Sequence, residues 1–273
     1  MKDLKNVKIG CIGSGTMGGA LMSAMAKKIG AKNISVTDVD FSKAKAFAEK
    51  HGMSALDSNI KVTESSDVIF LAVKPAYVTS VLKEISGQID ENKVVVSMAA
   101  GVKLDTLEEC FSYSAKFHII RIMPNLPATV GEAMIALSPS KNVSDEETAL
   151  VKELLDSAGK AEIVPEKLMD GVTAVSGSGP AYGFLFIEAL ADAAVRFGMP
   201  RAQAYVYAAQ TLKGAAAMAL EDGRSISELK DAVCSPAGTT IEGVIALEKN
   251  GFRNAVIEAA TAAFNKSVEL GKK

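Results

Sequence analysis

The sequence is poor in the residues that build metal centres and disulfide frameworks. It has two histidines and three cysteines among 273 residues. Cys11, Cys110 and Cys234 are odd in number and widely spaced, and no CxxC or Cys–His ligand spacing occurs. This set favours neither a disulfide framework nor a structural zinc site. We therefore expect no metal, and a reducing, cytoplasmic compartment.

Long apolar segments and blocks of one charge are also missing. The N-terminal stretch MKDLKNVKIG has no apolar h-region, so a signal peptide is not expected. The uncharged stretch 171–187 is short and interrupted by Gly, Ser and Pro, which argues against a membrane span. The formal net charge is −2 and no block of Lys and Arg stands out, which disfavours nucleic-acid binding. With 48% hydrophobic residues, the chain is long enough to bury a sizeable core.

The first half of the chain alternates short apolar runs with helical patterns. Apolar runs that suit strands buried on both faces occupy residues 7–12, 34–37, 68–73, 94–98 and 117–123, followed by shorter ones at 133–137 and 161–164. Helical patterns cover 17–27, 42–50 and 145–157, the last with Ser144 and Glu147 as a capping box. This alternation predicts an α/β domain with a doubly wound, mostly parallel sheet over residues 1–164.

The second half, residues 165–273, is rich in Ala, Met and Leu at helical spacing and predicts an all-α domain. Pro180 occupies the first position of one predicted helix, and Ser225 with Glu228 forms a capping box for another. Further predicted features are a helix at 201–220, a loop at 234–240 and two helices separated at 250–251. The small residues at 215–217 and 219 are compatible with close packing within the chain or with a helical dimer interface.

A glycine-rich turn opens the first predicted helix. Residues 13–18 match G-x-G-x-x-G directly after a strand, which is the context that a dinucleotide-binding Rossmann domain requires. Gly13 permits the tight turn, Gly15 lets the backbone approach the pyrophosphate, and Gly18 allows close packing of helix and strand. Asp38 follows 20 residues after Gly18, where a carboxylate binds the adenosine ribose.

The acid at the second strand bears on the choice of cofactor. A carboxylate repels a 2′-phosphate, so Asp38 favours NADH over NADPH. Lys43 and Lys45 lie close in sequence and could offset that repulsion, although a solvated helix face is the role that we favour for them.

Two pairs of loops are candidates for ligand contacts. Residues 73–75 and 98–101 follow apolar runs, at the edge of the sheet where parallel folds bind ligands. Residues 176–180 and 234–240 precede predicted helices of the second half, where free N–H groups suit a substrate carboxylate. Each of the latter two is also compatible with a plain capping turn.

These motifs together resemble the pyrroline-5-carboxylate reductases over essentially the whole chain. The resemblance rests on residues 13–18, 71–75, 99–101, 121–125, 176–182 and 235–240. The last segment, with Leu229 before it and Gly243 after it, is the most specific. The resemblance implies reduction of 1-pyrroline-5-carboxylate to L-proline with NADPH or NADH, the last step of proline synthesis. It also implies that the helical domain of residues 165–273 binds substrate and forms a homodimer, with larger rings of dimers such as a decamer.

The resemblance and the glycine motif together assign site residues. Cofactor binding falls to Ile12, Gly13, Ser14, Gly15, Thr16, Met17, Gly18, Asp38, Asn59, Ala72, Val73, Lys74, Pro75, Ala99, Ala100, Gly101, Met123, Pro124 and Asn125. Substrate binding falls to Glu166, Ser176, Gly177, Ser178, Gly179, Ser235, Ala237, Gly238, Thr239 and Thr240. The catalytic position is Thr240, which the resemblance puts near the imine nitrogen.

The sequence departs from the family pattern at three positions. Leu126 stands where Thr is common, and Ala237 stands where Gly is common. Asp38 is less expected, because many members of the family prefer NADPH. Two other functions remain open. A β-hydroxyacid dehydrogenase is disfavoured because Gly183 and Ile187 replace its usual catalytic Lys and Asn. A nicotinamide-sensing regulator without turnover is the second alternative.

Overall fold

The computed structural model describes residues 4–111 and 117–271 and divides into two compact units. The first unit comprises the chain up to Ser178 together with the residues from Ala263 onward, and the second comprises Gly179–Ala262. The domain boundary predicted between residues 164 and 165 stays a prediction. The two compact units reflect how the chain packs, and they do not define where each domain begins. None of the helices described is both long enough and apolar enough to cross a membrane.

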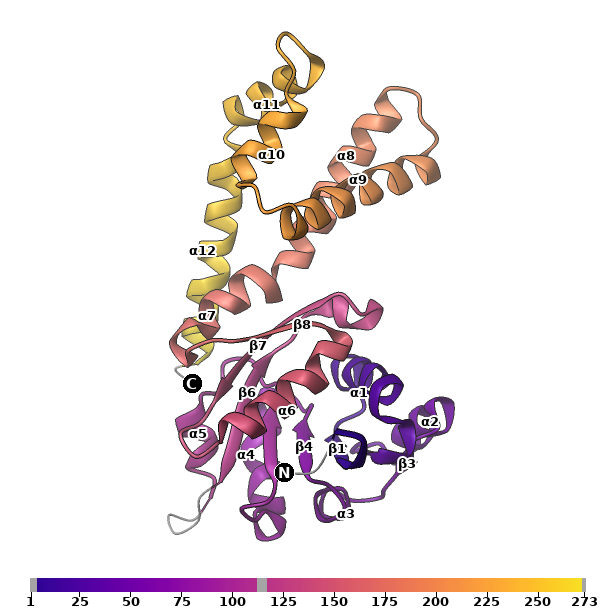
Figure 1. Ribbon diagram of the computed structural model, residues 1–273, viewed down its shortest axis with the longest axis vertical. Helices are drawn as coiled ribbons and strands as arrows, with labels where there is room; N and C mark the ends of the chain where they lie inside the picture. The colour runs from indigo at the N-terminus through magenta and orange to yellow at the C-terminus, as the bar shows by residue number, and fades with distance from the viewer. Residues whose placement is uncertain (1–3, 112–116, 272–273) are drawn as a thin grey trace. The chain divides into compact units, whose positions relative to one another are not determined.

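The first unit is built on one eight-stranded sheet (Figure 1). The strands are β1 (Ile9–Ile12), β2 (Ile34–Thr37), β3 (Ser54–Ala55), β4 (Val68–Leu71), β5 (Val94–Ser97), β6 (His118–Met123), β7 (Ala133–Pro139) and β8 (Gly159–Ile163). Their order is β3-β2-β1-β4-β5-β6-β7-β8. All neighbours pair in parallel except β6 and β7, which are antiparallel. This arrangement confirms the predicted doubly wound, mostly parallel sheet.

Helices cover both faces of this sheet. One face packs against α1 (Thr16–Ile29), α2 (Phe41–His51) and α6 (Asp145–Leu155), and the other packs against α3 (Asn59–Glu64), α4 (Pro75–Ile85) and α5 (Leu104–Glu108). Phe70 and Ile69 are adjacent in β4 but belong to the two different apolar layers. The central strands β1, β2, β4 and β5 are buried on both faces, which is why their sequences read as apolar runs.

The second unit consists of helices. They are α8 (Gly179–Arg196), α9 (Arg201–Glu221), α10 (Ile226–Val233), α11 (Thr239–Lys249) and most of α12 (Phe252–Leu270). Its buried core is small and contains Ala191, Ala204 and Ala208. The hydroxyl of Tyr182 donates to the Ala259 carbonyl at 3.3 Å, which links α8 to α12.

Both predicted capping boxes are present, one in each unit. Ser144 and Glu147 form the box of α6, and Ser225 and Glu228 form the box of α10. Each serine hydroxyl accepts from the glutamate N–H, and each carboxylate accepts from the serine N–H. These local signals therefore predicted the starts of two helices correctly.

The loop predicted at residues 176–180 is wrong. After α7 (Met169–Val172) the chain forms a π-helical turn over Thr173–Gly177, and α8 begins at Gly179, one residue before Pro180. The Ser178 N–H donates to the Thr173 carbonyl at 2.9 Å, which is the i→i+5 bond of a π-turn. The loop predicted at 234–240 is also shorter than expected, because α11 already begins at Thr239.

Candidate active site

The glycine turn lies where the strand order of the sheet reverses. It joins β1 to α1, and β1 pairs with β2 on one side and β4 on the other. Gly13 has a φ of +104°, and its N–H donates to the Thr37 carbonyl at 2.9 Å. A Cβ on Gly13 would lie 2.5 Å from the Ala72 oxygen, and one on Gly18 would lie 2.6 Å from the Gly13 oxygen. Close backbone packing therefore requires glycine at both positions.

Gly15 is different, because space on its side of the turn is open. It is exposed and is the N-cap residue of α1, and a Cβ built on it meets no protein atom within 4 Å. The first N–H groups of a helix have no intrahelical partners and carry a partial positive charge. The hollow that a side chain at Gly15 would fill therefore fits the pyrophosphate of a dinucleotide.

The Asp38 carboxylate is held against this turn. Its Oδ2 accepts from the Ser14 N–H at 2.7 Å and from the Ser14 hydroxyl at 3.0 Å, and its Oδ1 accepts from the Asp40 N–H at 3.1 Å. Complete burial, with a smaller contribution from the Asp38 charge, raises the pKa of Cys11 to about 12. The thiol therefore stays protonated and unreactive, while hydrogen bonds join the acid to the glycine turn.

The turn after β4 contacts the glycine turn directly. Ala72 donates its N–H to the Ile12 carbonyl at 2.8 Å. Lys74 is the exposed N-cap residue of α4, and Pro75 is the first residue of that helix. The turn after β5 contains Gly101, which has a φ of +77°. The structure thus brings Ala72 together with the glycine turn, and the contacts of Lys74, Val73, Ala99 and Ala100 with cofactor stay predictions.

The residues after β6 contact the π-helical turn. Asn125 is buried, its amide nitrogen donates to the Ser176 carbonyl at 2.9 Å, and its amide oxygen accepts from the Met134 N–H at 3.0 Å. A Cβ on Gly177 would lie 2.8 Å from the methyl carbon of Met123. Two predicted cofactor residues therefore touch two predicted substrate residues, and π-turns are frequent at functional sites.

Glu166 forms an ion pair that the sequence analysis did not predict. Its Oε1 accepts from Arg121 Nη1 at 2.9 Å and from the Leu104 N–H at 2.7 Å. Arg121 is only 5% exposed, so the Glu166 carboxylate neutralises a buried cation and caps α5. The one available signal was a charged residue inside the apolar run 117–123. Substrate contact by Glu166 stays a prediction.

Three more of the predicted residues, Asn59, Gly238 and Thr240, lie at helix starts. Asn59 is the first residue of α3, and its amide nitrogen donates to Glu84 at 2.8 Å. In the second unit, Gly238 is the N-cap residue of α11 and its N–H donates to the Ser235 carbonyl at 3.0 Å. A Cβ on Gly238 would overlap the Ser235 hydroxyl. Thr240 is the second residue of α11.

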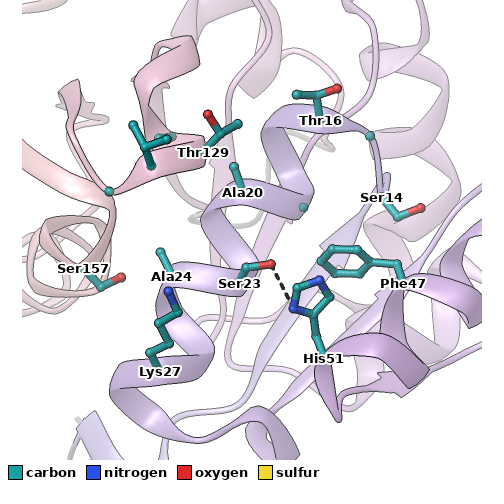
Figure 2. Close-up of a pocket in the computed structure, with 15 residues that line it drawn as sticks. Ser14, Thr16, Ala20, Ser23, Ala24, Lys27, Phe47, His51, Thr129 and Ser157 are labelled. Carbon is teal, nitrogen blue, oxygen red and sulfur yellow. Dashed lines mark hydrogen bonds between the residues drawn. The ribbon is translucent and has the colours of Figure 1, made fainter. Parts of the chain in front are cut away.

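A groove of about 560 Å³ runs along α1 away from the glycine turn (Figure 2). Ser14 and Thr16 lie at one end, and Lys27 lies further along the helix. The Ser23 hydroxyl and His51 Nδ1 are 3.4 Å apart, and His51 also packs on Phe47 with ring centroids 4.6 Å apart. Within the described chain, no group of three or more His, Cys, Asp or Glu side chains is placed to hold a metal ion.

Comparison with known proteins bears directly on this site. Residues 166–270 match the family model for pyrroline-5-carboxylate reductase dimerisation, and residues 8–101 match the model "NADP oxidoreductase coenzyme F420-dependent". Pyrroline-5-carboxylate reductase of Escherichia coli K12 is 46% identical over 267 residues, covering 97% of this chain and 98% of that protein. The chain belongs to the pyrroline-5-carboxylate reductase family. The resemblance predicted from the motifs is thereby confirmed.

Relatives and solved structures agree with this membership. The Methanosarcina acetivorans pyrroline-5-carboxylate reductase is 45% identical over 99% of this chain and 100% of that protein. The crystal structure of the Plasmodium falciparum enzyme with NADP bound is 34% identical, with a TM-score of 0.87 over 98% of this chain and 100% of that one. The Coxiella burnetii structure has 33% identity and a TM-score of 0.89, covering 98% of this chain and 100% of that one. The predicted two-part architecture, a Rossmann domain followed by helices, is confirmed.

Proposed function

We propose that the protein reduces the cyclic imine 1-pyrroline-5-carboxylate to L-proline with NADPH or NADH, the last step of proline synthesis. The observation that carries this proposal is the 46% identity to the Escherichia coli reductase over nearly the whole chain. The glycine cradle of the first unit and the 235–240 segment of the second are both intact. A β-hydroxyacid dehydrogenase lacks this support.

The first unit binds the nucleotide in this proposal. Gly15 leaves room for the pyrophosphate beside the N-terminus of α1, and residues 72–75, 99–101 and 123–125 line the path of the nicotinamide half. When bound, the reduced nicotinamide supplies a hydride to the imine carbon. The protein's task is to hold the two reacting carbons roughly 3–3.5 Å apart. The substrate can arrive with its nitrogen protonated, so the reaction needs no strong acid from the protein.

The substrate residues are those that the resemblance to the family indicates. Main-chain amides at the start of α11 bind the carboxylate, because a helix N-terminus favours an anion. The Thr240 hydroxyl hydrogen-bonds the ring nitrogen and keeps it oriented for attack at the neighbouring carbon. Further substrate residues are Glu166, Ser176, Gly177, Ser178, Gly179, Ser235, Ala237, Gly238 and Thr239.

The assembly and its setting belong to the same proposal. The protein acts as a homodimer formed by the C-terminal helices, and dimers associate into larger rings such as a decamer. It works in the cytoplasm, and neither nucleic acid nor membrane takes part. The family's dimerisation model, which covers residues 166–270, supports the dimer.

The proposal is tested by product analysis. Purified protein with 1-pyrroline-5-carboxylate should form L-proline in a 1:1 ratio to oxidised cofactor, measured by chiral chromatography. Thr240→Ala should lower kcat about 10- to 100-fold, because a hydrogen bond to a charged group is worth about 1.5–3 kcal/mol. Thr240→Ser should restore most of the rate, and Thr261→Ala on α12 is the matched control. A Thr240→Ala enzyme with unchanged turnover would remove Thr240 from the mechanism.

A further inference from the structure

The turn after β2 carries two carboxylates and an apolar side chain. Asp38 and Asp40 flank Val39, whose side chain is fully exposed. This turn lies beside the glycine turn, because Asp38 accepts both hydrogen bonds from Ser14. In the Rossmann fold the adenosine ribose lies at the end of the second strand. An exposed Val39 there offers an apolar surface to the adenine ring.

The Asp38 carboxylate is fixed in place but not saturated. Three hydrogen bonds, two from Ser14 and one from the Asp40 N–H, hold its oxygens at 2.7–3.1 Å. An ionised carboxylate has about four acceptor positions. One position is therefore left for a ribose hydroxyl, while the three bonds prevent the charge from swinging away from a bulkier group.

The neighbouring lysines do not neutralise this acid. Lys43 Nζ lies 3.5 Å from Asp40 Oδ2. Lys45 lines a separate hollow with Phe41 and Glu49. Hydrogen bonding by Ser42 and the nearby charge of Lys43 lower the pKa of Asp40, which keeps that carboxylate ionised. The contacts of Lys43 and Lys45 therefore do not offset the repulsion between Asp38 and a 2′-phosphate.

Arginine, the residue that accommodates a 2′-phosphate in many NADP-binding Rossmann domains, is missing from this part of the chain. The first 120 residues contain none. The first arginine, Arg121, is buried and bound to Glu166.

We propose that Asp38 makes this protein select NADH over NADPH, because its fixed carboxylate accepts a ribose hydroxyl and repels a 2′-phosphate. The inference rests on the proposed reductase function for its biological meaning, but it concerns nucleotide binding alone. The crystal structure of the Plasmodium falciparum relative has NADP bound, so the selection is proposed for this chain and not for the whole family.

Equilibrium binding without substrate tests this selection. Dissociation constants for NADH and NADPH, measured by fluorescence titration at one salt concentration, should differ at least tenfold in favour of NADH. Asp38→Asn keeps an oxygen for the Ser14 N–H but removes the charge, so it should tighten NADPH at least tenfold and change NADH by no more than a few fold. Asp57→Asn, in an exposed pair with Lys61, is the matched control and should leave the ratio unchanged.

A second measurement needs no variant. Because salt screens charge repulsion, raising NaCl from about 50 to about 500 mM should narrow the difference between the two cofactors in the wild-type protein. Tighter binding of NADPH than NADH would overturn the selection by Asp38, as would a folded Asp38→Asn protein with an unchanged ratio; either result leaves the reductase function standing. If folded wild-type protein binds neither cofactor, the inference and the proposed function fail together.

Discussion

The two units of the molecule differ in what fills their buried cores. Phe70 in β4 is fully buried between sheet and helices, whereas Phe184 in α8 is 59% exposed and Val206 in α9 is 65% exposed. The fully buried residues of the second unit's core are alanines. Exposed apolar surface on this scale marks an interaction site. The first unit thus buries a large apolar core within one chain, and the exposed apolar side chains of the second support our proposal that another copy covers them.

Two matched truncations test this difference between the units. Phe70→Ala should lower the free energy of unfolding by about 3–5 kcal/mol, because it leaves a cavity in a closed core. This loss should be the same at any protein concentration. Phe184→Ala should instead have an effect that shrinks as the protein is diluted into the monomer, since its contacts come from the second copy. Urea unfolding at two protein concentrations measures both effects. An effect of Phe184→Ala that does not depend on concentration would show that Phe184 makes no contact with a second copy.

A charge placed on α9 tests the same surface through the mass of the assembly in solution. Val206→Glu should weaken self-association about 100-fold or more, because burying an unpaired carboxylate costs several kcal/mol. Val130→Glu is the matched control on an exposed valine of the first unit and should leave the mass unchanged. Sedimentation velocity distinguishes them. Equal masses for both variants at low micromolar concentration would remove α9 from the interface.

The loop before α11 carries a local strain that the first unit lacks among its described residues. Ala237 has a φ of +54°, and every other positive φ in the described chain belongs to glycine. A left-handed conformation costs an L-residue roughly 1–2 kcal/mol. Because glycine also gains freedom in the unfolded chain, Ala237→Gly should stabilise the protein by about 0.5–1 kcal/mol in thermal unfolding. Ala219→Gly, inside α9, should destabilise it by about 1 kcal/mol, and the reverse order would contradict the strain.

Substitutions in the two capping boxes should have the smallest effects on stability, and these effects should depend on pH. Burial raises the pKa of Glu147, but hydrogen bonds from Ser144 and from His118, whose Nδ1 lies 2.6 Å away, outweigh it and lower that pKa. Hydrogen bonds from Ser225 lower the pKa of Glu228. A lowered carboxyl pKa adds stability above the unfolded value, about 4.3, which is lost as the pH falls through the folded value.

Replacing each glutamate by glutamine separates charge from shape, because Gln also fits the third position of a capping box. Glu147→Gln should cost about 0.5–1 kcal/mol at pH 7 and flatten the decline in stability below pH 4.3. Glu228→Gln, which has no histidine partner in its box, should cost less. Denaturant titrations at pH 7 and pH 3.5 measure both, and identical costs would show that the His118 contact adds nothing.

Much of this fold could be predicted from the sequence because its signals are local. Continuous apolar runs such as 68–73 mark strands buried on both faces, and the Ser144–Glu147 pair marks a helix start. The glycine spacing predicted the cradle because Gly13 and Gly18 contact each other within the connection from β1 to α1. Both also pack against Ala72, at the end of the neighbouring strand β4.

The features that sequence analysis missed depend on distant contacts. The π-turn at Thr173–Gly177 exists where Gly177 packs against Met123, 54 residues earlier, so its Ser and Gly residues resembled a loop. The pairing of Arg121 with Glu166 spans 45 residues and has no periodic signal. The antiparallel pairing of β6 with β7 is likewise set by the path of the chain. The roles of Thr240 and its neighbours came from resemblance, because a threonine at a helix start has no distinctive pattern.

The central claim is best tested by steady-state oxidation of NADH, and separately of NADPH, with 1-pyrroline-5-carboxylate as substrate. Our account predicts turnover that depends on the imine, with kcat/KM higher for NADH. If folded protein binds the cofactor yet oxidises neither NADH nor NADPH in the presence of the imine, the proposed reductase function is wrong and a nicotinamide-sensing role takes its place.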